Sequence, residues 1–218
     1  MTSSDHELAL QLHTELMTLT EPLHEALATA AQDAGTHLPA YKNAGNMSFL
    51  RSGIMRLGVR EHLSTVGVEG WSLGGNPNMM GQLQFVNNTG DLILRFLKDG
   101  RPPAPAVPHA GHNQARRAFW RNTPMLDLGI DSLFHTPPLH KLLLLWSPGE
   151  DGTFNVRAVR PLEPGKYSGR MAIDFSMELA PTRTAFEELK FVGEDHDEDL
   201  IIDIDKDEES DGATGAAG

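Results

Sequence analysis

The segment RMAIDFSMEL, residues 170–179, places the strongest constraint on the fold. Large apolar side chains occupy every second position from Met171 to Leu179, and smaller or charged residues lie between them. Because successive side chains of a strand point to opposite faces, this pattern predicts an antiparallel strand with one buried and one exposed face. Such a strand requires a sheet around it.

Two hairpins are predicted to supply that sheet. The apolar segments 82–86 and 91–97 flank the turn sequence NNTG, and the segments 139–146 and 153–162 flank SPGEDG. Asparagine and glycine accept the positive φ angles of tight turns. The unbroken leucines from Leu142 to Leu145 predict a strand covered on both faces. Strands that arrive as hairpins argue against a parallel βαβ order.

Helices are predicted at residues 6–34, 46–66 and 114–121. An apolar stripe with 4-3-4-3-4 spacing continues through Pro22, which favours one kinked first helix packed on its own domain. In the second helix, Leu50, Ile54 and Leu57 are expected to face inward, and Leu63 and Val66 continue this face after a phase shift near Gly58. Thr184 is expected to cap a short last helix. The stripe consists of Leu12, Leu16, Leu19, Leu23, Ala26 and Ala30.

These elements predict an α+β protein with N-terminal helices packed on a mainly antiparallel sheet of about five strands. We expect one domain at 1–193, with a helical part at 1–70 and a sheet part at 80–193, and a disordered acidic tail at 194–218. The first ten residues do not resemble a signal peptide, and no apolar run approaches the length of a membrane span. A soluble, cytoplasmic protein is therefore expected.

The acidic tail differs from the rest of the chain in its charge. The 218 residues carry a formal net charge of −12, and residues 194–211 hold eleven acids and one lysine. The tail also holds an apolar core at 200–204, made of Leu200, Ile201, Ile202 and Ile204. This core resembles the short hydrophobic-acidic motif that binds ubiquitin-like modifiers, and it has the β propensity to pair with a sheet edge of this chain or of another.

A second candidate site is the segment ARRAFWRN. It places Arg116, Arg117 and Arg121 beside Trp120 on a predicted helix. Arginine holds phosphate through two-pronged hydrogen bonds, and an indole can stack a base, so weak nucleic-acid contact is one interpretation. The other is that the aromatic residues anchor the helix in the core.

No complete catalytic signature is present. The absence of cysteine excludes thiol catalysis and thiolate metal sites, and no serine lies in a nucleophile-elbow pattern. His109, His112, His135 and His140 could form a metal site of a hydrolase or phosphodiesterase, although their loop setting favours surface histidines.

The function expected from these features is that of a non-enzymatic regulatory or protein-interaction protein, such as a bacterial or phage accessory protein, without a cofactor. Its acidic tail would engage a basic partner or mask the arginine segment. A metal-dependent hydrolase and a subunit of a larger assembly, joined through the stripe of the first helix, are the alternatives.

Overall fold

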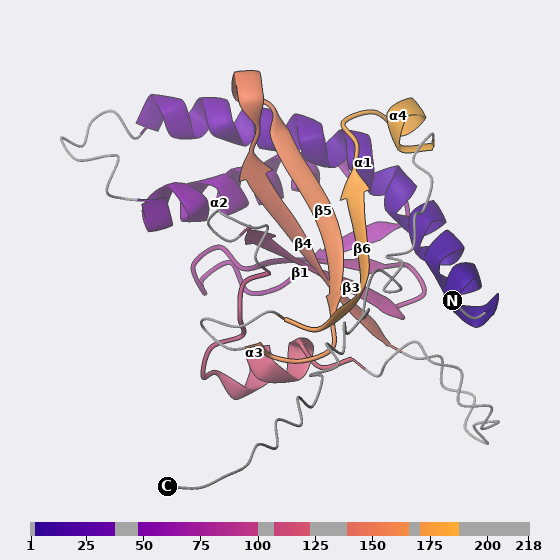
Figure 1. The fold of residues 1–218 in the computed structure, drawn as a ribbon. Helices are drawn as coiled ribbons and strands as arrows, with labels where there is room; N and C mark the ends of the chain where they lie inside the picture. The colour runs from indigo at the N-terminus through magenta and orange to yellow at the C-terminus, as the bar shows by residue number, and fades with distance from the viewer. Residues whose placement is uncertain (1–2, 38–47, 100–106, 123–138, 166–170, 188–218) are drawn as a thin grey trace, which may run out of the picture.

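The computed structural model describes residues 3–37, 48–99, 107–122, 139–165 and 171–187 (Figure 1). Within them, four α-helices and a six-stranded sheet confirm the predicted α+β class, with six strands instead of about five. The helices are α1 (Ser3–His37), α2 (Ser48–Val66), α3 (Gln114–Phe119) and α4 (Arg183–Glu187). The strands are β1 (Trp71–Gly74), β2 (Leu83–Asn87), β3 (Leu92–Lys98), β4 (His140–Pro148), β5 (Phe154–Pro161) and β6 (Ile173–Leu179), and the 3-10 turn η3 (Glu150–Gly152) joins β4 to β5.

The strands follow one another across the sheet in sequence order. Both predicted hairpins, β2–β3 and β4–β5, are confirmed, and β6 pairs antiparallel with β5. The additional strand β1 forms in the glycine-rich segment 70–81 and pairs with β2. The sheet is mainly antiparallel, as predicted, but the argument against a βαβ order does not hold for β3 and β4, which run parallel from Leu92↔His140 to Lys98↔Trp146. The connection between these two strands carries α3, so the chain crosses over between the hairpins.

Each face of the sheet has its own apolar layer. The helices α1 and α2 lie against one face, where Leu142, Leu144 and Trp146 of β4 point toward them. The alternate residues Leu143 and Leu145 belong to a second cluster with Trp120, which immediately follows α3. All four leucines of β4 are fully buried, as the unbroken run predicted. The second face is the one on which α3 lies.

The apolar stripe of α1 is confirmed, since all six of its predicted residues are at most 2 % exposed. Helix α1 continues through Pro22 as one helix and packs along α2. The stripe is therefore occupied within this chain and presents no free seam to another subunit.

The predicted inner face of α2 is confirmed in part. Leu63 is buried, and Leu50 and Ile54 are partly buried against the core. Val66 is 58 % exposed, and Leu57 is 47 % exposed instead of facing inward. The reason is a close approach of the two helices at Gly58, where an added Cβ would lie 2.8 Å from the Cβ of Ala30. Close contact through this glycine turns Leu57 away from the core.

Two further expectations concern the C-terminal part. The alternation of β6 is confirmed, because Phe175, Met177 and Leu179 are buried. The cap of α4 is Thr182 instead of Thr184, since the Thr182 hydroxyl accepts from the Ala185 amide at 3.2 Å. The acidic tail and its apolar core at 200–204 lie outside the described residues. None of the described helices combines the length and the apolarity needed to cross a bilayer.

Candidate anion-binding pocket

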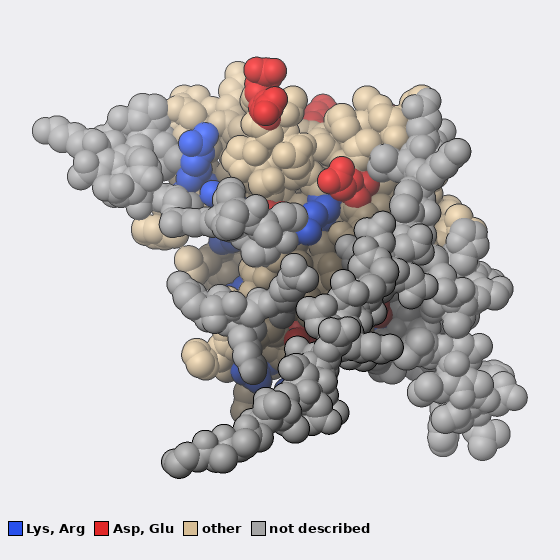
Figure 2. Space-filling view, in the orientation of Figure 1, with Lys and Arg blue, Asp and Glu red and all other residues tan. Residues whose placement is uncertain are grey.

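Three arginines from separate elements line one pocket of about 330 Å³. They are Arg56 of α2, Arg95 of β3 and Arg116 of α3, and we call their site the arginine pocket. Figure 2 shows basic side chains recurring down the left side of one face, from the level of α2 to that of α3. The other described lining residues are Met79, Met80, Leu97, Lys98 and Pro108, none of which is acidic.

Helix α3 holds Arg116 in the pocket because local contacts fix its position. The side chain of Asn113 caps the helix by accepting from the Arg116 amide at 3.0 Å. Trp120 is fully buried, and its indole Nε1 donates to the Pro108 carbonyl at 2.9 Å. A helix of six residues has little stability alone, so these anchors decide where Arg116 points.

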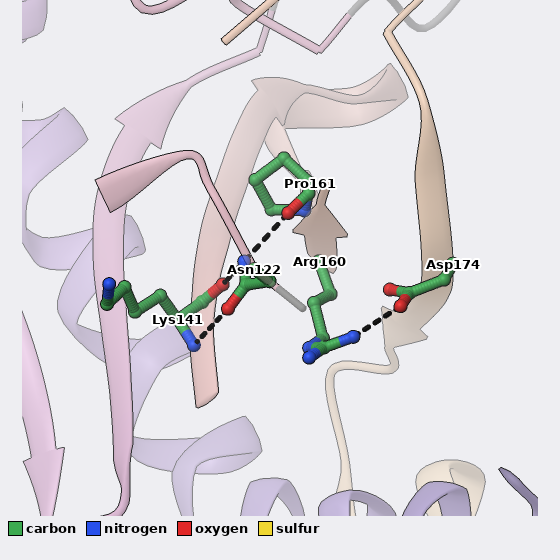
Figure 3. A network of polar contacts seen from close by, with 5 residues as sticks. All are labelled: Asn122, Lys141, Arg160, Pro161 and Asp174. Carbon is green, nitrogen blue, oxygen red and sulfur yellow. Dashed lines mark hydrogen bonds and ion pairs between the residues drawn. The ribbon is translucent and has the colours of Figure 1, made fainter. Parts of the chain in front are cut away.

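Asn122 ties the end of this helical segment to the sheet (Figure 3). Its amide Nδ2 donates to the carbonyls of Lys141 at 2.9 Å and Pro161 at 2.7 Å, and its Oδ1 accepts from the Lys141 amide at 3.1 Å. An ion pair between Arg160 and Asp174 lies beside this network and joins β5 to β6. One side chain thus connects the segment after α3 with both β4 and β5.

Arg56 holds the loop that forms another wall. Its Nη2 and Nε donate to the Met80 carbonyl at 2.7 and 3.2 Å. Arg60, one turn further along α2, donates to the Gly74 carbonyl at 2.8 Å. Met80 has a φ of 55°, which is uncommon for a residue with a side chain, and Gly81 follows with a φ of 68°. These contacts keep the side chains of Met79 and Met80 next to Arg56.

The described lining of the pocket concentrates positive charge and contains no carboxylate. Burial and the nearby charges of Arg116 and Arg56 lower the pKa of Arg95 to about 10. Burial also lowers the pKa of Arg116, and burial followed by the charge of Arg116 lowers the pKa of Arg56. Among the described residues, no hydrogen-bond acceptor reaches the buried Nε of Arg95 or of Arg116. Buried cations without partners are unfavourable, and an anion would satisfy them.

Aromatic rings provide part of the support for these charges. The guanidinium carbon of Arg116 lies 4.9 Å from the centre of the Trp120 ring, and that of Arg95 lies 5.6 Å from the same ring and 6.0 Å from Phe119. Cation–π contacts of this kind orient a guanidinium without neutralising it. Both guanidinium groups therefore keep their charge beside these rings.

The structure separates the four residues of the predicted arginine segment. Arg116 lines the pocket, Arg117 is half-buried outside the described lining, and Arg121 is exposed. The stacking role suggested for Trp120 was wrong, because its ring is fully buried and forms part of the second apolar layer. It is an anchor, which was the other interpretation of the segment.

Sequence reasoning missed Arg56 and Arg95 as site residues. Arg95 is the single charged residue within the apolar run of β3 from Leu92 to Leu97, and it faces the side of the sheet that α3 covers. A lone arginine in a strand that is otherwise apolar was the available signal. Arg56 gave no comparable signal, since exposed arginines are common on helices.

The candidate metal-binding histidines do not form a recognisable cluster in the described part of the chain. His109 accepts from the Gly111 amide through Nδ1 at 3.1 Å, and His112 is exposed. His140 begins β4, where burial followed by the charge of Arg160 lowers its pKa. His135 lies outside the described residues. Within those residues, no group of three or more His, Asp or Glu side chains is arranged to hold a metal ion.

Comparison of the chain with protein-family models, curated proteins and solved structures gave no significant match.

Proposed function

We propose that this chain is a non-enzymatic interaction protein that holds an anionic group of its partner in the arginine pocket. The observation that carries the proposal is the convergence of Arg56, Arg95 and Arg116 on a pocket whose described lining contains no acid. Two of the three have a buried Nε without an acceptor among the described residues. Arginine forms strong charge-assisted hydrogen bonds with carboxylate and phosphate groups, so such a constellation suits an anionic ligand.

The acidic segment 194–211 is an internal competitor in this proposal. Its eleven acids against one lysine complement the charge of the pocket. When the partner is absent, carboxylates of the tail would occupy the arginine pocket and raise the concentration of partner needed for binding. An intramolecular anion has a high effective concentration, so even a weak contact would compete.

Titration calorimetry with pyrophosphate, a compact polyvalent anion, tests both parts on the full-length chain. Arg95→Met is expected to weaken binding at least about tenfold, since the side chain lies in the wall of the pocket. Arg117→Gln removes one charge from the same helix but leaves the described lining intact, so it serves as the matched control. Equal binding by the wild type and Arg95→Met would contradict the proposal.

The role of the tail is tested in the full-length chain with the acids of residues 194–211 replaced by their amides. Loss of the internal competitor is expected to strengthen pyrophosphate binding, most clearly at low salt, where screening is weakest. Unchanged affinity at every salt concentration would remove the tail from the proposal and leave the pocket in place.

A further inference from the structure

The shape and walls of the arginine pocket narrow the class of anion that it accepts. We infer that its ligand is a phosphate monoester carried beside an apolar group. This inference rests on the proposed function, because it specifies the ligand of the same pocket. Charge, donor geometry, volume and apolar lining each contribute to it.

The charge of the pocket favours a ligand with more than one negative charge. Arg56, Arg95 and Arg116 bring three positive charges together, and Lys98 also lines the site. A phosphate monoester carries about −1.5 to −2 charges at neutral pH, whereas a carboxylate, a sulfate ester or a phosphodiester carries one. Burial and then the charges of Arg116 and Arg56 lower the pKa of Arg95, and a dianion offsets more of this unfavourable charge than a monoanion does.

The donors are distributed around the pocket in a way that suits a group with several oxygens. Arg56 uses Nε and Nη2 to hold the Met80 carbonyl, which fixes its guanidinium. The buried Nε atoms of Arg95 and Arg116 have no acceptor among the described residues. Because the three guanidinium groups come from three elements, one planar carboxylate cannot meet all of them as well as a tetrahedral phosphate can.

The size of the pocket argues against a length of nucleic-acid backbone. Its volume of about 330 Å³ is near the lower end of the range for small-molecule sites. A terminal phosphate enters such a site with one ester link leading out. A phosphodiester must leave it in two directions, and charges arranged along an extended groove suit it better.

The apolar lining predicts what lies next to the phosphate. Met79 and Met80 are 61 % and 68 % exposed, and Leu97 and Pro108 complete the described apolar wall. Methionine side chains are flexible and polarisable, so they adapt to varied apolar surfaces. The positive φ of Met80, held by the bond from Arg56, is a strained conformation that keeps both side chains beside the charged site.

Calorimetry of the full-length chain with phenyl phosphate and phenyl sulfate at equal ionic strength tests the inference. The two ligands have similar size and shape and differ chiefly in charge. Phenyl phosphate is expected to bind at least about tenfold more tightly at pH 7.5. Its affinity should fall toward pH 5, as the second phosphate pKa of about 6 is passed, while that of phenyl sulfate should not fall. The described lining contains no histidine or carboxylate that titrates in this range.

Single substitutions test where the phosphate and the apolar group of the ligand bind. Arg116→Gln and Arg95→Met should each weaken phenyl phosphate binding, whereas Arg117→Gln should not. The wild type is expected to bind phenyl phosphate roughly fivefold more tightly than inorganic phosphate. Met79→Gln should remove this preference and leave the binding of inorganic phosphate unchanged. Adenosine monophosphate and a phosphoserine peptide, compared under the same conditions, distinguish a small-molecule source of the phosphate from a protein source.

The outcomes separate this inference from the proposed function. Equal binding of phenyl sulfate and phenyl phosphate would overturn the monoester and leave an anion pocket. Tighter binding of an oligonucleotide without terminal phosphates would likewise overturn it, in favour of a phosphodiester ligand. If pyrophosphate, phenyl phosphate and phenyl sulfate all fail to bind, the proposed function and the inference are both wrong.

Discussion

Replacing Arg95 with methionine is expected to stabilise the fold while it weakens anion binding. Burial and the charges of Arg116 and Arg56 lower the pKa of Arg95 to about 10, which means that the folded state disfavours the charged guanidinium. Each pKa unit corresponds to about 1.4 kcal/mol, so the cost at neutral pH is roughly 3 kcal/mol before solvent screening. The side chain is half-buried at the pocket, and screening reduces this cost to about 1–2 kcal/mol.

The opposing terms are smaller. Contacts of Arg95 with the rings of Phe119 and Trp120 contribute about 0.5–1 kcal/mol, and methionine keeps most of the packing of the aliphatic stem. The net expectation is that Arg95→Met raises the free energy of unfolding by about 0.5–1 kcal/mol. With a urea m-value of about 2 kcal/mol/M, the midpoint of urea unfolding should rise by roughly 0.3–0.5 M.

The pH dependence gives an independent check. Because the folded pKa is lowered, the unfolded chain binds the Arg95 proton more tightly, and wild-type stability relative to the variant should rise as pH increases through about 10. Between pH 6 and 9 the difference should stay constant. At saturating phosphate the wild type should become more stable than Arg95→Met, because only the wild type gains stability from the ligand.

A paired arginine provides the matched control. Arg157 donates two hydrogen bonds of 2.9 Å to Asp99, so Arg157→Met should lower the free energy of unfolding by about 1–3 kcal/mol. If Arg95→Met is destabilised to the same degree, Arg95 is a structural arginine and the reasoning from its unpaired charge is wrong.

Three other predictions concern the framework of the pocket and its supporting helices. Gly58→Ala should destabilise the fold by about 1 kcal/mol in urea unfolding, because the new Cβ would meet Ala30 at 2.8 Å, whereas Gly53→Ala on the same helix has open space and should stabilise it by about 0.5–1 kcal/mol. Asn122→Ala should lower the free energy of unfolding by about 2–3 kcal/mol and weaken pyrophosphate binding, because three hydrogen bonds that position α3 are lost. A loss of stability without any change in binding would contradict the positioning role. Burial lowers the pKa of His24, so stability should fall as pH decreases from 7 to 5, and His24→Gln should flatten this dependence in unfolding curves measured across that range.

Local periodicity was sufficient to predict most of the elements. The α1 stripe, the two hairpins and the alternation of β6 each depend on residues close together in the sequence, and the structure confirms them. The exposure of Leu57 in α2 could not be found this way, because it follows from contact between Gly58 and Ala30 of another helix. The parallel pairing of β3 with β4 also depends on a long connection and left no periodic signal.

The site was only partly accessible to sequence reasoning for the same reason. Arg116 was predicted because it lies in a local cluster of basic and aromatic residues. Arg56 and Arg95 reach the pocket from two other elements, and only the tertiary fold brings them to Arg116. The burial of Trp120 depends likewise on the strands beneath α3, which no local pattern contains.

The most direct test of the account is an NMR titration of the arginine Nε–H resonances with phenyl phosphate in the full-length chain. The account predicts that the resonances of Arg95 and Arg116 shift together along one saturable curve, since their Nε–H groups have no acceptor among the described residues before the ligand binds. Arg157, already paired with Asp99, should not move. If the resonances of Arg95 and Arg116 stay fixed at saturating ligand, the arginine pocket does not bind anions and the central claim is wrong.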